Sequence, residues 1–154
     1  MSDAGPDEPT GGTPGSADPD PAADRPAGLR LEVLHVHLQV CRLNHDAPIP
    51  SWLPRTSSPL TAIIRTDDEL SIVCPAAEVP ADVHHDGPWR ALRVAGPLDL
   101  TLVGVLAGLT TALADAGVSV LAVSTFDTDH LLVRGDDLDG AVAALRGAGH
   151  VVEA

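Results

Sequence analysis

Two stretches of helical periodicity, separated by two consecutive strand patterns, most constrain how this chain can fold. Apolar residues recur at helical spacing from Leu102 to Ala116, with Asp99 and Thr101 as candidate N-terminal caps, and again from Leu138 to Leu145. The segment between the two stripes is rich in apolar and β-branched residues, which favour strands. The order of elements is therefore β-α-β-β-α-β, with strands expected at 89–95, 118–124, 129–134 and 151–152.

The first half of the chain carries a weaker version of the same pattern. Residues 31–41 are rich in β-branched residues and partly alternating, so they predict one strand, and two short strands follow at 60–65 and 70–74. Prolines at positions 48, 50, 54 and 59 leave room for no more than one helical turn there. We therefore predict an α+β fold of two ferredoxin-like βαββαβ units, each an antiparallel sheet with helices on one face.

The N-terminal residues differ from the rest of the chain in composition. Residues 1–28 contain no Leu, Ile, Val or aromatic residue, so they cannot bury enough apolar surface to offset the entropy lost on ordering. We expect a disordered, acidic, Pro/Gly-rich leader at 1–28, a first unit at 29–86 and a second unit at 87–154.

The charge balance and the two cysteines exclude several partners. The chain has 22 acidic residues against 9 arginines and no lysine, for a formal net charge of −13, and such a chain repels nucleic-acid phosphates. No apolar run approaches the roughly 18 residues of a membrane span, and the N-terminus lacks the pattern of a signal peptide. Cys41 and Cys74 have no CxxC spacing and are expected to be reduced and buried. We expect a cytoplasmic protein with no nucleic-acid or membrane partner.

Four segments together resemble a known family. They are Arg65–Cys74, which ends in Glu-Leu-Ser-Ile-Val-Cys, then Trp89–Pro97, Gly104–Ala107, and Ser124–His130, which contains Ser-Thr-Phe-x-x-Asp. In these segments the chain resembles the ACT-domain proteins related to the cytosolic arginine sensor of animals, in their short bacterial tandem form. The resemblance extends over residues 29–153 and leaves only the leader outside.

The resemblance implies a function and a site. ACT domains are typically amino-acid-binding regulatory units that pair with a second copy, so it implies a sensor without catalytic activity or cofactor. The animal sensors carry four units in one chain and this chain carries two, so a complete equivalent requires a homodimer. The ligand-binding residues implied are Gly104, Val105 and Leu106 at the start of the first helix, and Thr125, Phe126 and Asp129 around a strand-turn-strand.

The chemistry of these positions suits a zwitterion. A helix N-terminus offers unpaired N–H groups to a carboxylate, and Gly104, without a Cβ atom, lets a ligand approach the backbone. Asp129 can pair with an ammonium or guanidinium group. Ser124 and Thr125 add hydroxyl groups at a strand end, and Phe126 adds an aromatic face for a cation or an aliphatic stem. An amino acid or a similar small zwitterion has the complementary groups.

Other interpretations of the same residues stay open at this stage. Residues 127–129 are also typical of a solvated hairpin turn, Gly104 of close helix–sheet packing, and Phe126 of a core aromatic. His35 and His37 share a strand face and His84-His85-Asp86 lie elsewhere, but no spacing of a metal site accompanies them. Asp99 and Asp129 are a candidate acid–base pair, but no nucleophile or phosphate-binding motif accompanies them to support an enzyme.

The sequence therefore predicts a non-catalytic regulatory module that binds a small molecule, an amino acid being the expected ligand. The alternative is a structural or protein-interaction module whose ACT-like pocket is vestigial. The identity of the ligand, the downstream partner and the position of the pocket, within one chain or between subunits, stay open.

Overall fold

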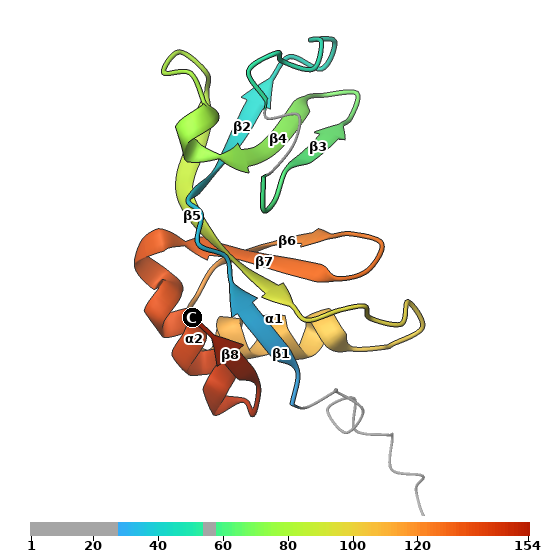
Figure 1. Cartoon of the computed structure of the whole chain (residues 1–154), viewed down its shortest axis with the longest axis vertical. Helices are drawn as coiled ribbons and strands as arrows, with labels where there is room; N and C mark the ends of the chain where they lie inside the picture. Colours follow the sequence, from blue (N-terminus) through green and yellow to red (C-terminus); the bar gives the residue numbers. More distant parts are fainter. Residues whose placement is uncertain (1–27, 54–57) are drawn as a thin grey trace, which may run out of the picture.

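The computed structural model describes residues 28–53 and 58–154, so the predicted leader lies outside the described residues apart from Gly28. The described residues form one eight-stranded sheet, two α-helices and two short 3₁₀ helices (Figure 1). In chain order these are β1 (Arg30–Val33), β2 (Leu38–Leu43), β3 (Ala62–Arg65), β4 (Leu70–Pro75), η1 (Ala76–Glu78), β5 (His85–Val94), α1 (Val105–Asp115), β6 (Val120–Ser124), β7 (Asp129–Arg134), η2 (Gly135–Asp137), α2 (Leu138–Gly147) and β8 (Val151–Glu153).

The long strand β5 connects the two ends of the sheet. Along one edge its first half pairs with β2 and its second half with β1, both antiparallel. Along the other edge it pairs with β7, which in turn pairs with β6. The strand order is β3-β4-β2-β5-β1-β8, with β7 and β6 on the second side of β5. Figure 1 shows β2, β3 and β4 at one end of β5, and the β6–β7 hairpin with both helices at the other.

The second half of the chain has the predicted element order, β5-α1-β6-β7-α2-β8, and the α+β fold class is confirmed. Helices α1 and α2 pack on one face of the sheet. The core between the layers contains the buried residues Leu31, Val33, Leu92, Val94, Leu109, Leu113, Leu131, Val133 and Leu145. Each such side chain contributes about 1.5–3 kcal/mol through burial, so this layer is the main source of stability.

The first half extends the same sheet past β5, and some of its apolar side chains pack on the helix-free face of β5 and β7. Its strands β2, β3 and β4 carry no α-helix within 28–53 and 58–84, only the short η1. One buried cluster joins the halves and contains Leu34, Leu38, Leu60, Val73, Trp89, Ala91 and Leu132. The predicted boundary between residues 86 and 87 lies inside β5, so both predicted units share that strand, and the division into two units stays a prediction.

The prediction of a single strand at 31–41 is wrong, because the structure has two strands there, β1 and β2, with residues 34–37 between them. The amide of Leu34 still donates to the carbonyl of Ala91 at 2.8 Å. The register of β5 with its partners changes across this segment and again within β2. Such irregularities bend a sheet locally. The apolar pattern continues through the bend, so it does not reveal where the ladder breaks.

Helix α1 begins at Val105, later than the predicted stripe, which includes Leu102. Neither Asp99 nor Thr101 is its cap, because Gly104 occupies that position in the left-handed conformation, with φ +82°. The ten residues between β5 and α1 therefore form a loop, which includes the predicted first turn of the helix at Leu102. No helix of the described part of the chain has the length and apolar character needed to cross a membrane.

Both cysteines are fully buried in the first half, as the sequence predicts. Cys41 on β2 and Cys74 on β4 belong to one apolar cluster. Burial, together with the neighbouring Cys41, raises the pKa of the Cys74 thiol to about 12. A thiol that stays protonated is a poor nucleophile, so these residues pack as small apolar side chains.

Candidate functional site

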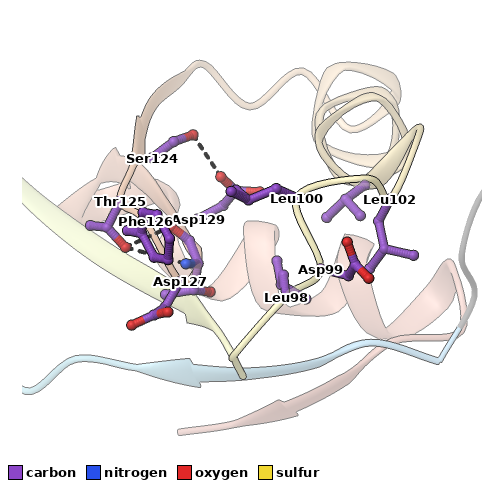
Figure 2. Close-up of a pocket in the computed structure, with 11 residues that line it drawn as sticks. Leu98, Asp99, Leu100, Leu102, Ser124, Thr125, Phe126, Asp127 and Asp129 are labelled. Atoms are coloured by element: carbon purple, nitrogen blue, oxygen red, sulfur yellow. Dashed lines mark hydrogen bonds between the residues drawn. The ribbon is translucent and has the colours of Figure 1, made fainter.

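A cavity of about 200 Å³ opens between the loop that precedes α1 and the β6–β7 hairpin (Figure 2). Its walls come from two segments far apart in sequence, which meet because α1 crosses the sheet and returns the chain to β6. The lining residues are Leu98, Asp99, Leu100, Leu102, Val105, Ser124, Thr125, Phe126, Asp127, Thr128 and Asp129.

The hairpin turn that forms one wall is held by its own threonines. The amide of Thr125 donates to the carbonyl of Thr128 at 2.8 Å, and the amide of Thr128 donates to the Thr125 hydroxyl at 3.2 Å. Thr and Asp are frequent in such turns because their side chains bond nearby backbone groups. The Thr128 hydroxyl donates to the Val94 carbonyl at 2.5 Å, and the Leu98 amide donates to the Asp127 carbonyl at 2.7 Å. These two bonds join the turn to the end of β5 and to the loop.

Ser124 and Asp129 lie directly opposite each other in the hairpin and share the face that points toward the cavity (Figure 2). The Ser124 hydroxyl donates a 2.6 Å hydrogen bond to a carboxylate oxygen of Asp129. This bond orients the carboxylate and uses one of its lone pairs, leaving the others for a ligand.

The loop wall contributes a second fixed carboxylate. Asp99 accepts hydrogen bonds from the Thr101 amide at 2.8 Å and from the Thr101 hydroxyl at 2.7 Å. The backbone bond, followed by the hydroxyl bond, lowers the pKa of Asp99 below its usual value. A carboxyl group held in its ionised form is unsuited to act as a general acid near neutral pH, which argues against an acid–base role for Asp99.

The charges of the cavity are all of one sign. Its lining residues include three carboxylates, Asp99, Asp127 and Asp129, and none of these residues, all within the described part, is Arg, Lys or His. The remaining polar groups are hydroxyls, and Leu98, Leu102 and Val105 form an apolar wall. Such a cavity is complementary to a positively charged group on a short apolar stem.

The first turn of α1 supplies the opposite polarity. Val105 is both the first residue of the helix and a lining residue. The first N–H groups of a helix have no partners inside it, and among the described residues no side chain caps this end. The N-terminus of α1 therefore offers free donors and a partial positive charge beside three carboxylates.

The structure brings together five of the seven predicted site residues. Val105, Ser124, Thr125, Phe126 and Asp129 all line the cavity. The two others do not: Gly104 provides the positive φ that precedes α1, and Leu106 packs, partly buried, against the main core. The interpretation of Phe126 as a core aromatic is wrong, because 81% of this residue is exposed.

Sequence reasoning missed most of the loop wall, Leu98, Leu100 and Leu102, together with Asp127 and Thr128 of the turn. Leu102 fits the helical stripe, so the apolar pattern assigned it to the helix. The available signal was local: an Asp two residues before a Thr, shortly after Gly96-Pro97, is typical of a turn.

The histidines of the first half do not form a recognisable metal site. Within residues 28–53 and 58–154, no three His, Cys, Asp or Glu side chains converge as metal ligands would. His85 Nδ1 instead lies 2.8 Å from the Val83 carbonyl.

Two segments of this chain match models of known protein families. A family model described as an ACT domain matches residues 85–147, and a model of an N-terminal domain matches residues 37–82. The ACT-domain match falls within the described residues, whereas the second match includes residues 54–57, which lie outside them.

Solved structures give a similar result. Protein Atu0741 from Agobacterium tumefaciens is 36% identical, with a TM-score of 0.74 over 81% of this chain and 92% of that one. The Vibrio cholerae protein VC0802, of unknown function, is 20% identical, with a TM-score of 0.66 over 79% and 91%. The regulatory subunit of aspartate kinase from Thermus flavus is 9% identical, with a TM-score of 0.55 over 80% and 99%. At these lower identities the likeness concerns the fold alone.

Proposed function

Since this chain belongs to the same family as protein Atu0741 of Agobacterium tumefaciens and contains an ACT domain at 85–147, we propose that it is a non-catalytic regulatory module that binds an amino acid. The binding site is the cavity between the loop before α1 and the β6–β7 hairpin. The observation that carries the proposal is that Val105 and Asp129 line the same cavity. The uncapped end of α1 receives the ligand carboxylate, and the aspartates receive its ammonium group.

The excess of carboxylates makes the proposal more specific. A neutral zwitterion needs one cationic and one anionic partner, whereas this cavity has three carboxylates and one helix end. An amino acid with a cationic side chain, whose net charge is positive, matches that ratio better than a neutral one.

The rim of the cavity supports a homodimer. Four large apolar residues around it are half or more exposed: Leu100 at 72%, Leu102 at 50%, Val103 at 78% and Phe126 at 81%. Exposed apolar side chains gathered at one place mark interaction surfaces in soluble proteins. A second copy that covers this rim excludes water from the ligand and encloses the cavity. The free, buried thiols of Cys41 and Cys74 are consistent with a cytoplasmic location.

The competing function is that of an interaction module without a ligand. It is favoured by the size of the cavity, which at about 200 Å³ is smaller than the roughly 300–1,000 Å³ of typical ligand pockets. A dimer that encloses the cavity removes this difficulty for a molecule as small as an amino acid.

Thermal unfolding in the presence of each of the twenty amino acids separates the two functions. A ligand at 100 times its dissociation constant adds about 2.7 kcal/mol to the free energy of unfolding. We expect arginine or lysine to give the largest increase in melting temperature. If none of the twenty amino acids raises the melting temperature at millimolar concentration, the interaction module is favoured.

A further inference from the structure

A second cavity, of about 480 Å³, lies on the other side of the same hairpin. Leu92 and Val94 of β5 and Leu131 and Val133 of β7 face the helices. Side chains alternate along a strand, so Arg93 and His130 face away from the helices, toward this second cavity. The other lining residues are Gly96, Pro97, Thr125, Asp127 and Thr128.

The cavity wall contains a buried polar group that the protein itself does not satisfy. His130 is only 5% exposed, and its Nδ1 atom has no hydrogen-bond partner among the described residues. Buried polar atoms nearly always have a partner, and an unpaired one calls for an explanation. His130 is also one of the residues that line the second cavity.

Arg93 places a positive charge beside this histidine. The two residues are directly opposite in the register of β5 and β7. The guanidinium group donates one hydrogen bond, at 2.6 Å, to Glu32 on β1, and both side chains of that pair are about half exposed. A guanidinium group has five N–H donors in a planar arrangement, so most of them stay available.

We propose that this second cavity binds an anionic group, a carboxylate or a phosphate, between Arg93 and His130. Arginine binds both groups through two parallel hydrogen bonds, and the His130 ring adds a third donor from the wall when it is protonated. The inference does not depend on the ligand of the first cavity, because Arg93 and His130 line the second cavity and not the first.

Two opposing charges limit the affinity without excluding it. Asp127 lines the cavity and Glu32 pairs with Arg93, so the anion must sit on the Arg93–His130 side. The net charge of −13 also repels anions. At physiological ionic strength this long-range repulsion is screened beyond about 8 Å, so the local donors decide the binding.

His130 also reports on occupancy of the cavity. Burial lowers the pKa of His130 below its usual value; the Val123 carbonyl on β6 and Asp129 raise it, and Arg93 lowers it. Other charged groups on this side of the sheet include Asp127 in the turn, Glu32 beside Arg93, and the Arg30–Glu153 pair on β1 and β8. An anion bound against the ring favours the protonated form, so it raises the pKa of His130.

The test is an NMR titration of the isotope-labelled full chain with inorganic phosphate, and separately with acetate, at constant ionic strength. We expect saturable shifts of the amide signals of residues 125–130 and an increase in the pKa of the His130 ring. Arg93→Gln should raise the dissociation constant at least about fivefold. Glu32→Gln, which frees the guanidinium group, should lower it.

Arg30→Gln is the matched control. Arg30 is also an exposed arginine that pairs with a glutamate, Glu153, but it does not line the cavity. We expect the Arg30→Gln variant to bind the anion with the same dissociation constant as the unmodified protein. Shifts that do not saturate, or equal weakening by Arg93→Gln and Arg30→Gln, would overturn the proposal in favour of general ionic effects. Saturation by only one of the two anions identifies the chemical class. Because Arg93 is half exposed, its variant is expected to fold even where a variant of the buried His130 does not.

Discussion

Ser124 and Asp129 face each other across the β6–β7 hairpin, and the serine hydroxyl donates a 2.6 Å hydrogen bond to the aspartate carboxylate. The bond holds one negative charge at the wall of the cavity, close to the first turn of α1. The proposed amino-acid site depends on this arrangement, since a carboxylate that moved freely would lose rotamer entropy on binding.

Asp129→Asn tests the role of that charge. The asparagine side chain keeps an oxygen that can accept the bond from Ser124, so the free energy of unfolding should change by less than about 1 kcal/mol. A charge-assisted bond to the ligand contributes about 1.5–3 kcal/mol, so affinity for the amino acid should fall roughly 10-fold to 100-fold. Isothermal titration calorimetry measures the affinity, and urea denaturation measures the stability.

The control for this experiment is Asp115→Asn. Asp115 is exposed at the C-terminal end of α1, the end away from the cavity, and its substitution removes one negative charge from the same chain. Asp127 is unsuitable as a control because it lines both cavities. Equal affinities for Asp129→Asn and Asp115→Asn would remove Asp129 from the site.

Much of the second half could be predicted from periodicity alone. The strand β7 has the predicted bounds, 129–134, because both of its faces are buried and turn residues precede it. The ACT resemblance is confirmed over 85–147. The relation to the animal arginine sensor and the tandem arrangement stay predictions, because neither the family models nor the solved structures test them.

The position of β1 could not be predicted. In the structure β1 lies between β5 and β8, antiparallel to the first and parallel to the second. Strand pairing depends on contacts between residues far apart in sequence, such as Leu31 with Val94 and with Val152. An alternating pattern says which face of a strand is buried and does not say which strand lies beside it.

The candidate site was predictable where it lies on regular elements and not where it lies on the loop. Ser124 and Asp129 lie on strands whose pattern is strong. Leu98, Leu100 and Leu102 follow no period in the structure, because Asp99 and Gly104 hold the chain in a turn and a left-handed conformation. Local polar bonds determine the shape of this loop, and a hydrophobic pattern does not register them.

Gly104→Ala should destabilise the protein. Gly104 has φ +82°, a left-handed conformation that costs a residue with a Cβ atom about 1–2 kcal/mol. The melting temperature should fall by a few degrees, and binding should weaken because α1 starts at the cavity. The matched control is Gly140→Ala in the interior of α2, where a Cβ atom meets only Val118 at 4.0 Å. That substitution should stabilise the protein by about 0.5–1 kcal/mol. Chemical denaturation of both variants checks the opposite signs.

Stability should depend on pH through two buried histidines. Burial lowers the pKa of His130 and of His150 below the ordinary value of 6.5. As pH falls below 6.5 the unfolded chain takes up protons that the folded chain does not, so the free energy of unfolding decreases with falling pH. Urea denaturation at pH 7.5 and pH 5.5 measures this difference. In His150→Gln the difference should be smaller than in the unmodified protein, and an unchanged difference would show that His150 does not contribute.

The apolar rim of the cavity predicts how the chain assembles. Val103 in the loop before α1 and Phe126 in the hairpin turn are 78% and 81% exposed, so a second copy that covers the rim buries both. Light scattering should give about twice the monomer mass of 15.8 kDa, and the double variant Val103→Ser, Phe126→Ser should give the monomer mass without a loss of stability. Its control is Ile63→Ser on the edge strand β3, also exposed, at 43%, but in the other half of the chain. If Ile63→Ser yields the monomer and the rim variant stays dimeric, the copies pair through the edge of β3, and the cavity is completed within a single chain.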